Sequence, residues 1–177
     1  MTLGELLREK SDAIVRRWFE GASATYPKDA AVAFRRRKDP FANPVGHSLR
    51  VGTRGIFDTL LEGGDAAAVE PYLRDMVKIR AVQQFSASEA VGFVFGLKEA
   101  VRAELGPAAG DARFSSELAE FEGRIDRVAL AAFDVFVECR ERVTELRINE
   151  VKRNVAWVLE RMNQGGFDPE RPRSDLG

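Results

Sequence analysis

Two long runs of apolar residues, spaced in alternating steps of three and four, occupy the C-terminal third of the chain. The first run is Leu118, Phe121, Ile125, Val128, Ala132, Val135 and Cys139, and the second is Ile148, Val151, Val155, Val158 and Met162. This spacing predicts one helix from about Ser115 to Met162. The two runs do not share a register, so its apolar face shifts between Val143 and Leu146. A helix of roughly 45 residues is about 70 Å long, which exceeds the size of a small domain, so we expect one end to project or to pair.

Shorter helices are predicted before this long one. Capping boxes at Thr2–Glu5 and Ser86–Glu89 and a capping Asp65 mark helix starts. Tyr26-Pro27, Gly63-Gly64 and Gly106-Pro107 mark helix ends. The expected helical ranges are 2–26, 28–38, 44–62, 65–80 and 86–106. No strand pattern is visible, so the sequence predicts an all-α fold, with residues 1–162 as a single domain and 163–177 as a disordered tail.

Composition and charge argue against nucleic-acid-binding, secreted and membrane-spanning proteins. The net charge of −1 creates no global field to recruit nucleic acid. The N-terminal segment lacks the apolar stretch of a signal peptide, and the strongest apolar runs are too short to cross a bilayer. One cysteine, Cys139, excludes an intramolecular disulfide. We therefore expect a cytoplasmic protein that neither binds nucleic acid nor inserts into a membrane.

Two stretches place polar residues beside aromatic and helix-breaking ones. The first runs from Lys38 to His47 and contains Asp39, Phe41 and Asn43. The second runs from Ile79 to Ser86 and contains Arg80, Gln83 and Phe85. Because each stretch has polar groups that need partners, we expect the first to pack against Arg80 and Gln83. A cation and an amide beside aromatics can hold the carboxylate of a ligand, or can lock the Asn43-Pro44 turn to the core. Both interpretations stay open.

Residues for catalysis or metal binding are scarce. His47 is the only histidine, and neither a second histidine nor a cysteine lies near it in the sequence. Cys139 falls in an apolar stripe with no histidine to activate it. We therefore predict no catalytic residues, no metal site and no cofactor, and hence no enzyme. A haem- or metal-binding protein of globin-like type is the alternative.

Four segments, in order between about Leu6 and Arg102, resemble the RsbRD N-terminal domain family, a sensory module of stress-response regulators and some histidine kinases. The segments are Ile14–Phe19 with Thr25–Pro27, Asp39–Gly46, Ile79–Ser86, and Ala90–Lys98, which adds Lys98 to the motif residues. The resemblance is to the version found as stand-alone proteins or on kinases. It implies a globin-like helical bundle that lacks haem and forms dimers. In the better-known members an anti-sigma-factor domain follows and carries the signal onward. No such domain is seen after residue 162, so we expect this chain to signal in a different way.

The sequence and the resemblance together predict a non-enzymatic sensory or signalling module. It is expected to bind a small ligand or a protein partner of a signalling pathway and to relay its state through the long helix. We expect one apolar face of the long helix to pair with a second copy of the chain. We call this face the seam; it consists of Ile148, Val151, Val155, Val158 and Met162.

Overall fold

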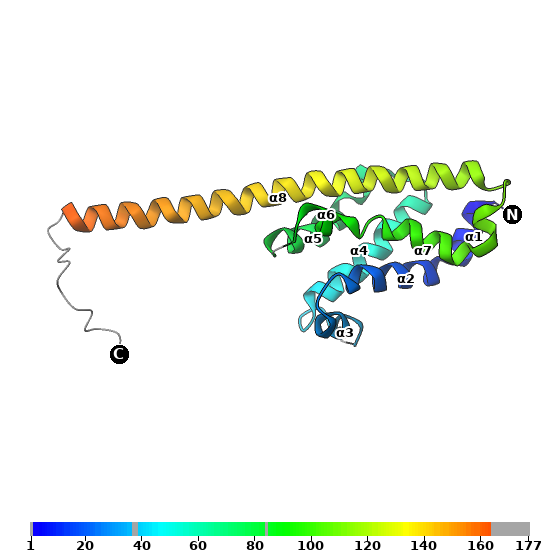
Figure 1. Cartoon of the computed structure of the whole chain (residues 1–177), viewed down its shortest axis with the longest axis horizontal. Coiled ribbons are helices and arrows are strands. Elements are labelled where there is room, and N and C mark those ends of the chain that lie inside the picture. Colours follow the sequence, from blue (N-terminus) through cyan, green and yellow to red (C-terminus); the bar gives the residue numbers. More distant parts are fainter. Residues whose placement is uncertain (1, 37–38, 84, 164–177) are drawn as a thin grey trace. The chain divides into compact units, whose positions relative to one another are not determined.

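The structure, a computed structural model, describes residues 2–36, 39–83 and 85–163, and this part of the chain is helical with no strand (Figure 1). The helices are α1 (Leu3–Glu9), α2 (Ser11–Ala24), α3 (Lys28–Arg36), α4 (Pro44–Leu61), α5 (Ala66–Val82), α6 (Ala87–Gly92), α7 (Gly96–Leu105), the 3₁₀ helix η1 (Gly106–Gly110) and α8 (Ser115–Asn163). The all-α prediction is confirmed. The expected disordered tail lies, from residue 164 on, outside the described residues. The globin-like arrangement stays a prediction.

The chain divides into two compact units, Met1–Arg140 and Glu141–Gly177, which we describe separately. Within the described residues, no helix is long and apolar enough to cross a membrane. The first unit contains α1 to α7, η1 and the first half of α8. The second contains the other half of α8. The prediction that residues 1–162 act as one domain stays a prediction.

The core of the first unit lies between α2, α4, α5, α7 and the first half of α8. Trp18 of α2 is almost fully buried, its ring stacks on Phe93, and its indole N–H donates to the Phe93 carbonyl at 2.7 Å. Phe57 of α4 meets Phe121 of α8 edge to face, with ring centroids 6.3 Å apart. Each large side chain buried in this way stabilises the fold by about 1.5–3 kcal/mol. These aromatic contacts therefore join α2 to the segment between α6 and α7, and α4 to the first half of α8.

Local signals in the sequence set the helix boundaries. Both predicted capping boxes are present, at Thr2–Glu5 and Ser86–Glu89, and the Asp65 side chain accepts from the backbone N–H of Ala68. Helix α4 ends at Leu61, and Gly63 follows with a φ of 89°, a conformation that glycine adopts without strain. Gly106, with a φ of 57°, ends α7 in the same way.

Two expected helices are each divided in the structure, so those predictions are wrong in detail. The helix expected over 2–26 breaks at Lys10, which separates α1 from α2. The helix expected over 86–106 breaks at residues 93–95, where backbone hydrogen bonds shorten to three-residue spacing. The second break places the Phe93 carbonyl toward Trp18, whose indole N–H it accepts. Apolar periodicity alone does not reveal such a break, because the core-facing residues continue through it.

The first half of α8 packs on the rest of the first unit. Its buried residues are Leu118, Phe121, Ile125, Val128, Ala129, Ala132, Val135 and Phe136. Ion pairs border this apolar face: Arg102 of α7 with Glu122 at 2.5 Å, and Arg74 of α5 with Glu138 at 2.9 Å. Figure 1 shows α8 passing alongside α7 and α5. Cys139 is half-buried at the edge of this face, and burial raises the pKa of its thiol.

In the second unit, α8 has no buried residue in its described part. The seam residues Ile148, Val151, Val155, Val158 and Met162 are between 40% and 60% exposed. Trp157 and Leu159 are exposed beside them, and the Arg161 guanidinium lies 5.0 Å from the centre of the Trp157 ring. The second unit therefore presents an apolar surface that its own described residues do not cover.

Candidate functional site

Arg80, a predicted site residue, is fully buried where α2, α5 and α6 meet. Its guanidinium donates hydrogen bonds to three oxygens: the Ala22 carbonyl at 3.2 Å, the Thr25 hydroxyl at 3.0 Å and the Glu89 carbonyl at 3.1 Å. The rings of Tyr26, Phe85 and Phe93 surround it, with centroids 4.9, 5.2 and 4.6 Å from the guanidinium carbon. The side chain thus joins the end of α2 to the start of α6.

No carboxylate forms an ion pair with Arg80 within the described residues. The charge is balanced instead by carbonyls at the C-terminal end of α2, where the helix dipole is negative, and by the faces of three rings. Burial lowers the pKa of Arg80, and attraction to Tyr26 opposes this effect. Burial raises the pKa of Tyr26, and Arg80 offsets part of that rise. The ordinary pKa of arginine is so high that Arg80 keeps its charge at physiological pH.

A route of contacts leads from the predicted turn at Asp39–His47 to Arg80 through Phe34 and Tyr26. Asn43 caps α4 by accepting from the Gly46 N–H at 2.9 Å, and its amide donates to the Phe34 carbonyl at 3.3 Å. The Phe34 ring meets Tyr26 edge to face, and Tyr26 in turn lies against Arg80. The expected direct packing of the turn on Arg80 and Gln83 stays a prediction.

The other predicted residues lie in separate places. Asp39 accepts from the Phe41 N–H at 3.0 Å, and Phe41 is 96% exposed. His47 is half-buried and lines a pocket of about 280 Å³ between α4 and α5. Lys98 of α7 pairs with Asp126 of α8 at 2.6 Å.

Gln83 follows α5 directly, three residues after Arg80. It is half-buried, and its side-chain oxygen has no hydrogen-bond partner among the described residues. The sequence thus places Gln83 and Phe85 close to Arg80. The other predicted residues, such as Lys98, His47 and Asp39, lie on other helices or in the turn before α4. Among the described residues, the structure places Phe85 directly against Arg80, while Asp39, Phe41, Asn43 and His47 are joined to one another by hydrogen bonds within the turn.

A recess in the first unit was not predicted from the sequence. It has a volume of about 770 Å³ and lies between α2 and α4, with Tyr72 of α5 at one side. We call it the α2–α4 groove. Helix α2 contributes Asp12, Val15, Arg16 and Phe19, and α4 contributes Arg50, Val51, Thr53, Arg54, Gly55, Asp58 and Thr59, followed by Glu62. Its volume falls within the range of small-molecule sites.

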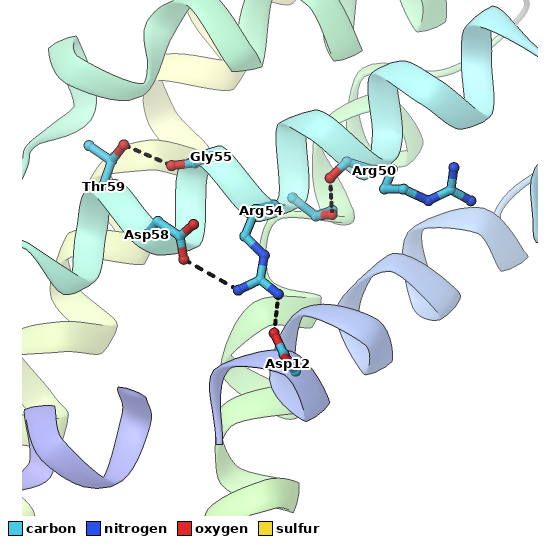
Figure 2. Close-up of polar contacts among 7 residues, drawn as sticks. Asp12, Arg50, Arg54, Gly55, Asp58 and Thr59 are labelled. Atoms are coloured by element: carbon cyan, nitrogen blue, oxygen red, sulfur yellow. Dashed lines mark hydrogen bonds and ion pairs between the residues drawn. The ribbon is translucent and has the colours of Figure 1, made fainter. Parts of the chain in front are cut away.

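An ion-pair network crosses the middle of the α2–α4 groove. Arg54 contacts Asp12 of α2 through one nitrogen and Asp58 of its own helix through another, the latter at 3.5 Å (Figure 2). The hydrogen bond that Arg54 donates to Asp12 is the largest influence on the Arg54 pKa and raises it. Figure 2 shows the Arg50 side chain extending away from this network. The arginines of α4 that line the groove are four residues apart, a spacing that is visible in the sequence but that many exposed helices share.

Among the described residues there is no group of three or more histidine, cysteine, aspartate or glutamate side chains that could hold a metal ion. Hydroxyls near the groove are engaged with backbone: Thr53 donates to the Leu49 carbonyl at 2.8 Å and Thr59 to the Gly55 carbonyl at 2.7 Å. The groove thus offers ion-paired and unpaired charged side chains beside apolar surface, and such groups can bind a ligand.

Residues 12–151 match the family described as the RsbT co-antagonist protein rsbRD N-terminal domain. The match spans most of the chain, so the chain belongs to this family, as the sequence motifs predicted. The family is a sensory and regulatory one and is not known as catalytic. Neither a curated protein nor a solved structure matches the chain significantly.

Proposed function

We propose that this protein is a non-enzymatic sensory module of the cytoplasm, whose first unit receives a small ligand or partner and whose long helix α8 relays the bound state. The observation that carries the proposal is the contrast within α8. Its first half is buried in the first unit, whereas its second half carries an uncovered apolar seam. One continuous helix can transmit a shift from its packed half to its exposed half, because helices move largely as rigid elements.

The occupant that we propose for the seam is a second copy of the chain. In a seven-residue repeat, Ile148, Val155 and Met162 fall at one seam position, and Val151 and Val158 fall at the other. This pattern fits helices that interlock side chains in a coiled coil. Pairing within the family, as the resemblance implies, supports the same occupant.

The positions that flank the seam in this repeat carry mostly positive charge. Arg147, Asn154 and Arg161 lie on one side, and Lys152 and Leu159 lie on the other. In a parallel pair Arg147 faces Lys152 of the second copy, and in an antiparallel pair Arg147 faces Arg161. Like charges therefore meet in either orientation, and they oppose the apolar attraction. Salt screens such exposed charges, so the proposed dimer should become tighter as ionic strength rises.

Light scattering after gel filtration, at micromolar protein, tests the dimer. We expect a mass of twice the 19.7 kDa of the chain, with a larger dimer fraction at about 500 mM than at about 50 mM salt. A mass of one chain at both salt concentrations would contradict the proposal.

Substitution at the seam supplies the matched control. Val155→Glu should shift the protein toward monomer, because it places an unpaired charge in the paired surface. Ala156→Glu adds the same charge at an exposed neighbouring position off the seam and should leave the dimer intact. Equal effects of the two variants would show that charge, and not seam contact, governs association.

A further inference from the structure

Two arginines that line the α2–α4 groove have no carboxylate partner among the described residues. Arg54, in the middle, is engaged by Asp12 and Asp58. Arg16 of α2 and Arg50 of α4 also line the groove, and neither forms an ion pair within the described part of the chain. The groove therefore carries an acidic network around Arg54 and two arginines that stand outside this network.

The Arg50 guanidinium is held in place before any ligand arrives. One of its nitrogens donates to the Phe34 carbonyl at 3.1 Å, and its carbon lies 5.2 Å from the centre of the Phe19 ring. These contacts use part of the donor set of an arginine, which has five N–H groups in a fixed plane. The remaining N–H groups make no further hydrogen bond among the described residues, and a side chain already held by two contacts loses less entropy when it binds an anion.

Apolar surface lines the groove together with these arginines. Val15 and Phe19 line the α2 side of the groove, and Val51 lines the α4 side. Tyr72 closes the wall against Gly55, where a side-chain Cβ atom would lie only 2.4 Å from the ring. The absence of a side chain at Gly55 lets the Tyr72 ring approach the α4 backbone. A ligand anchored at Arg50 thus meets aromatic and aliphatic surface along its body.

The carboxylates of the groove limit how much negative charge a ligand can carry. Asp58 and Glu62 line the groove, and Asp12 adds a third carboxylate. A polyphosphate or dicarboxylate would bring its further charges toward these groups, and like charges in a partly enclosed site repel. A single anionic group on an apolar body avoids that repulsion.

The geometry points to an organic monoanion as the ligand of the α2–α4 groove: one carboxylate bound by Arg50 and Arg16, and an apolar body against Phe19 and Tyr72. This inference rests on the proposed sensory function and names the ligand class for it. Such a carboxylate can be an aliphatic acid released from lipid or a free aromatic acid, and both share this chemistry.

Isothermal titration of the full chain with four probes tests the inference. The probes are octanoate, phenylacetate, octyltrimethylammonium and AMP. We expect one of the two carboxylates to bind, and the cation and the nucleotide to bind at least about tenfold more weakly, which corresponds to the loss of one charge-assisted contact. The better of the two carboxylates identifies an aliphatic or an aromatic source.

Variants connect the binding to the groove. Arg16→Gln should weaken carboxylate binding about tenfold, and Arg50→Gln at least as much. Because Arg50 also bonds to the Phe34 carbonyl, Arg16→Gln is the variant that separates binding from folding. Arg17→Gln is the matched control, since Arg17 neighbours Arg16 on α2 but pairs with Glu104 at 2.6 Å, outside the groove. It should leave the affinity unchanged.

Three results would overturn the inference. They are preferred binding of the cation or of AMP, equal effects of Arg16→Gln and Arg17→Gln, and no binding by any probe up to millimolar concentration. None of them alters the light-scattering test of the dimer, so failure of the proposed ligand class and failure of the proposed dimer can be told apart. Octanoate or phenylacetate binding that depends on Arg16 supports the inference.

Discussion

Replacement of Arg80 tests whether a buried charge without a carboxylate holds the ends of α2, α5 and α6 together. Its three hydrogen bonds to Ala22, Thr25 and Glu89 contribute about 1.5 kcal/mol each, and the three rings add about 2 kcal/mol. The cost of removing the guanidinium from water, several kcal/mol, offsets a large part of this sum. We therefore expect Arg80→Ala to lower the free energy of unfolding by about 3 kcal/mol.

Thermal unfolding followed by circular dichroism measures the effect. For a chain of this length, about 3 kcal/mol corresponds to a fall in Tm of roughly 6–12 °C. Arg80→Met separates charge from volume, because methionine fills much of the space but donates no hydrogen bond. Arg74→Ala is the control, since Arg74 is partly exposed and pairs with Glu70 and Glu138 on the surface.

The two variants of Arg80 distinguish the possible roles of the side chain. If the charge matters, Arg80→Met remains clearly less stable than the parent, because the Ala22 and Glu89 carbonyls lose a donor. A Met variant as stable as the parent, or more stable, would refute the reasoning, since it would show that desolvation outweighs the bonds.

Three further predictions concern the caps and the histidine. Asn43→Ala should cost about 1–2 kcal/mol in urea unfolding, whereas Asn43→Asp, which keeps the acceptor for the Gly46 N–H, should cost less; equal losses would argue against the cap. Hydrogen bonds from Ser86 lower the pKa of Glu89 below its ordinary 4.5, so the stabilisation is present above that pH and is lost as pH falls through the folded-state pKa. Glu89→Ala should thus lower the urea midpoint more at neutral pH than in acid, and an equal fall at both would contradict this. Protein purified from haem-supplemented cells should show no Soret band, because the pocket beside His47, of about 280 Å³, is too small to enclose a haem; an intense band would overturn this expectation.

Much of the fold was accessible from the sequence because its signals are local. Capping residues such as Thr2, Asp65 and Ser86 act within three residues of themselves, so the sequence displays both the donor and the acceptor. The long helix was likewise predicted by its apolar spacing, and α8 indeed begins at Ser115. The division between α6 and α7 was missed; the Phe93 carbonyl at this break accepts a hydrogen bond from Trp18, 75 residues away, a contact that the local sequence does not display.

The candidate site was less accessible, since its contacts join distant segments. Arg80 was singled out for its neighbours in the sequence, but its partners Ala22 and Thr25 lie at the end of α2 and could not be identified from the motif. The α2–α4 groove was missed altogether. Its residues, such as Arg16 and Asp58, look like ordinary charged positions of exposed helices until the helices are placed side by side.

Among the described residues of the first unit, polar contacts are of two kinds: those that include a carboxylate, and those, such as the contacts of Arg80, that do not. The ties between α8 and its neighbours include the Arg74–Glu138 pair, in which Arg74 lowers the pKa of Glu138, and such a tie requires an ionised acid. They weaken when acid protonates that group or when salt screens it. The Arg80 contacts involve only carbonyls, a hydroxyl and ring faces, which do not titrate in acid. Acidification should therefore loosen the contacts along the first half of α8, while the junction of α2, α5 and α6 keeps its polar contacts. The first unit thus combines contacts that respond to pH and salt with a junction that does not respond to acid.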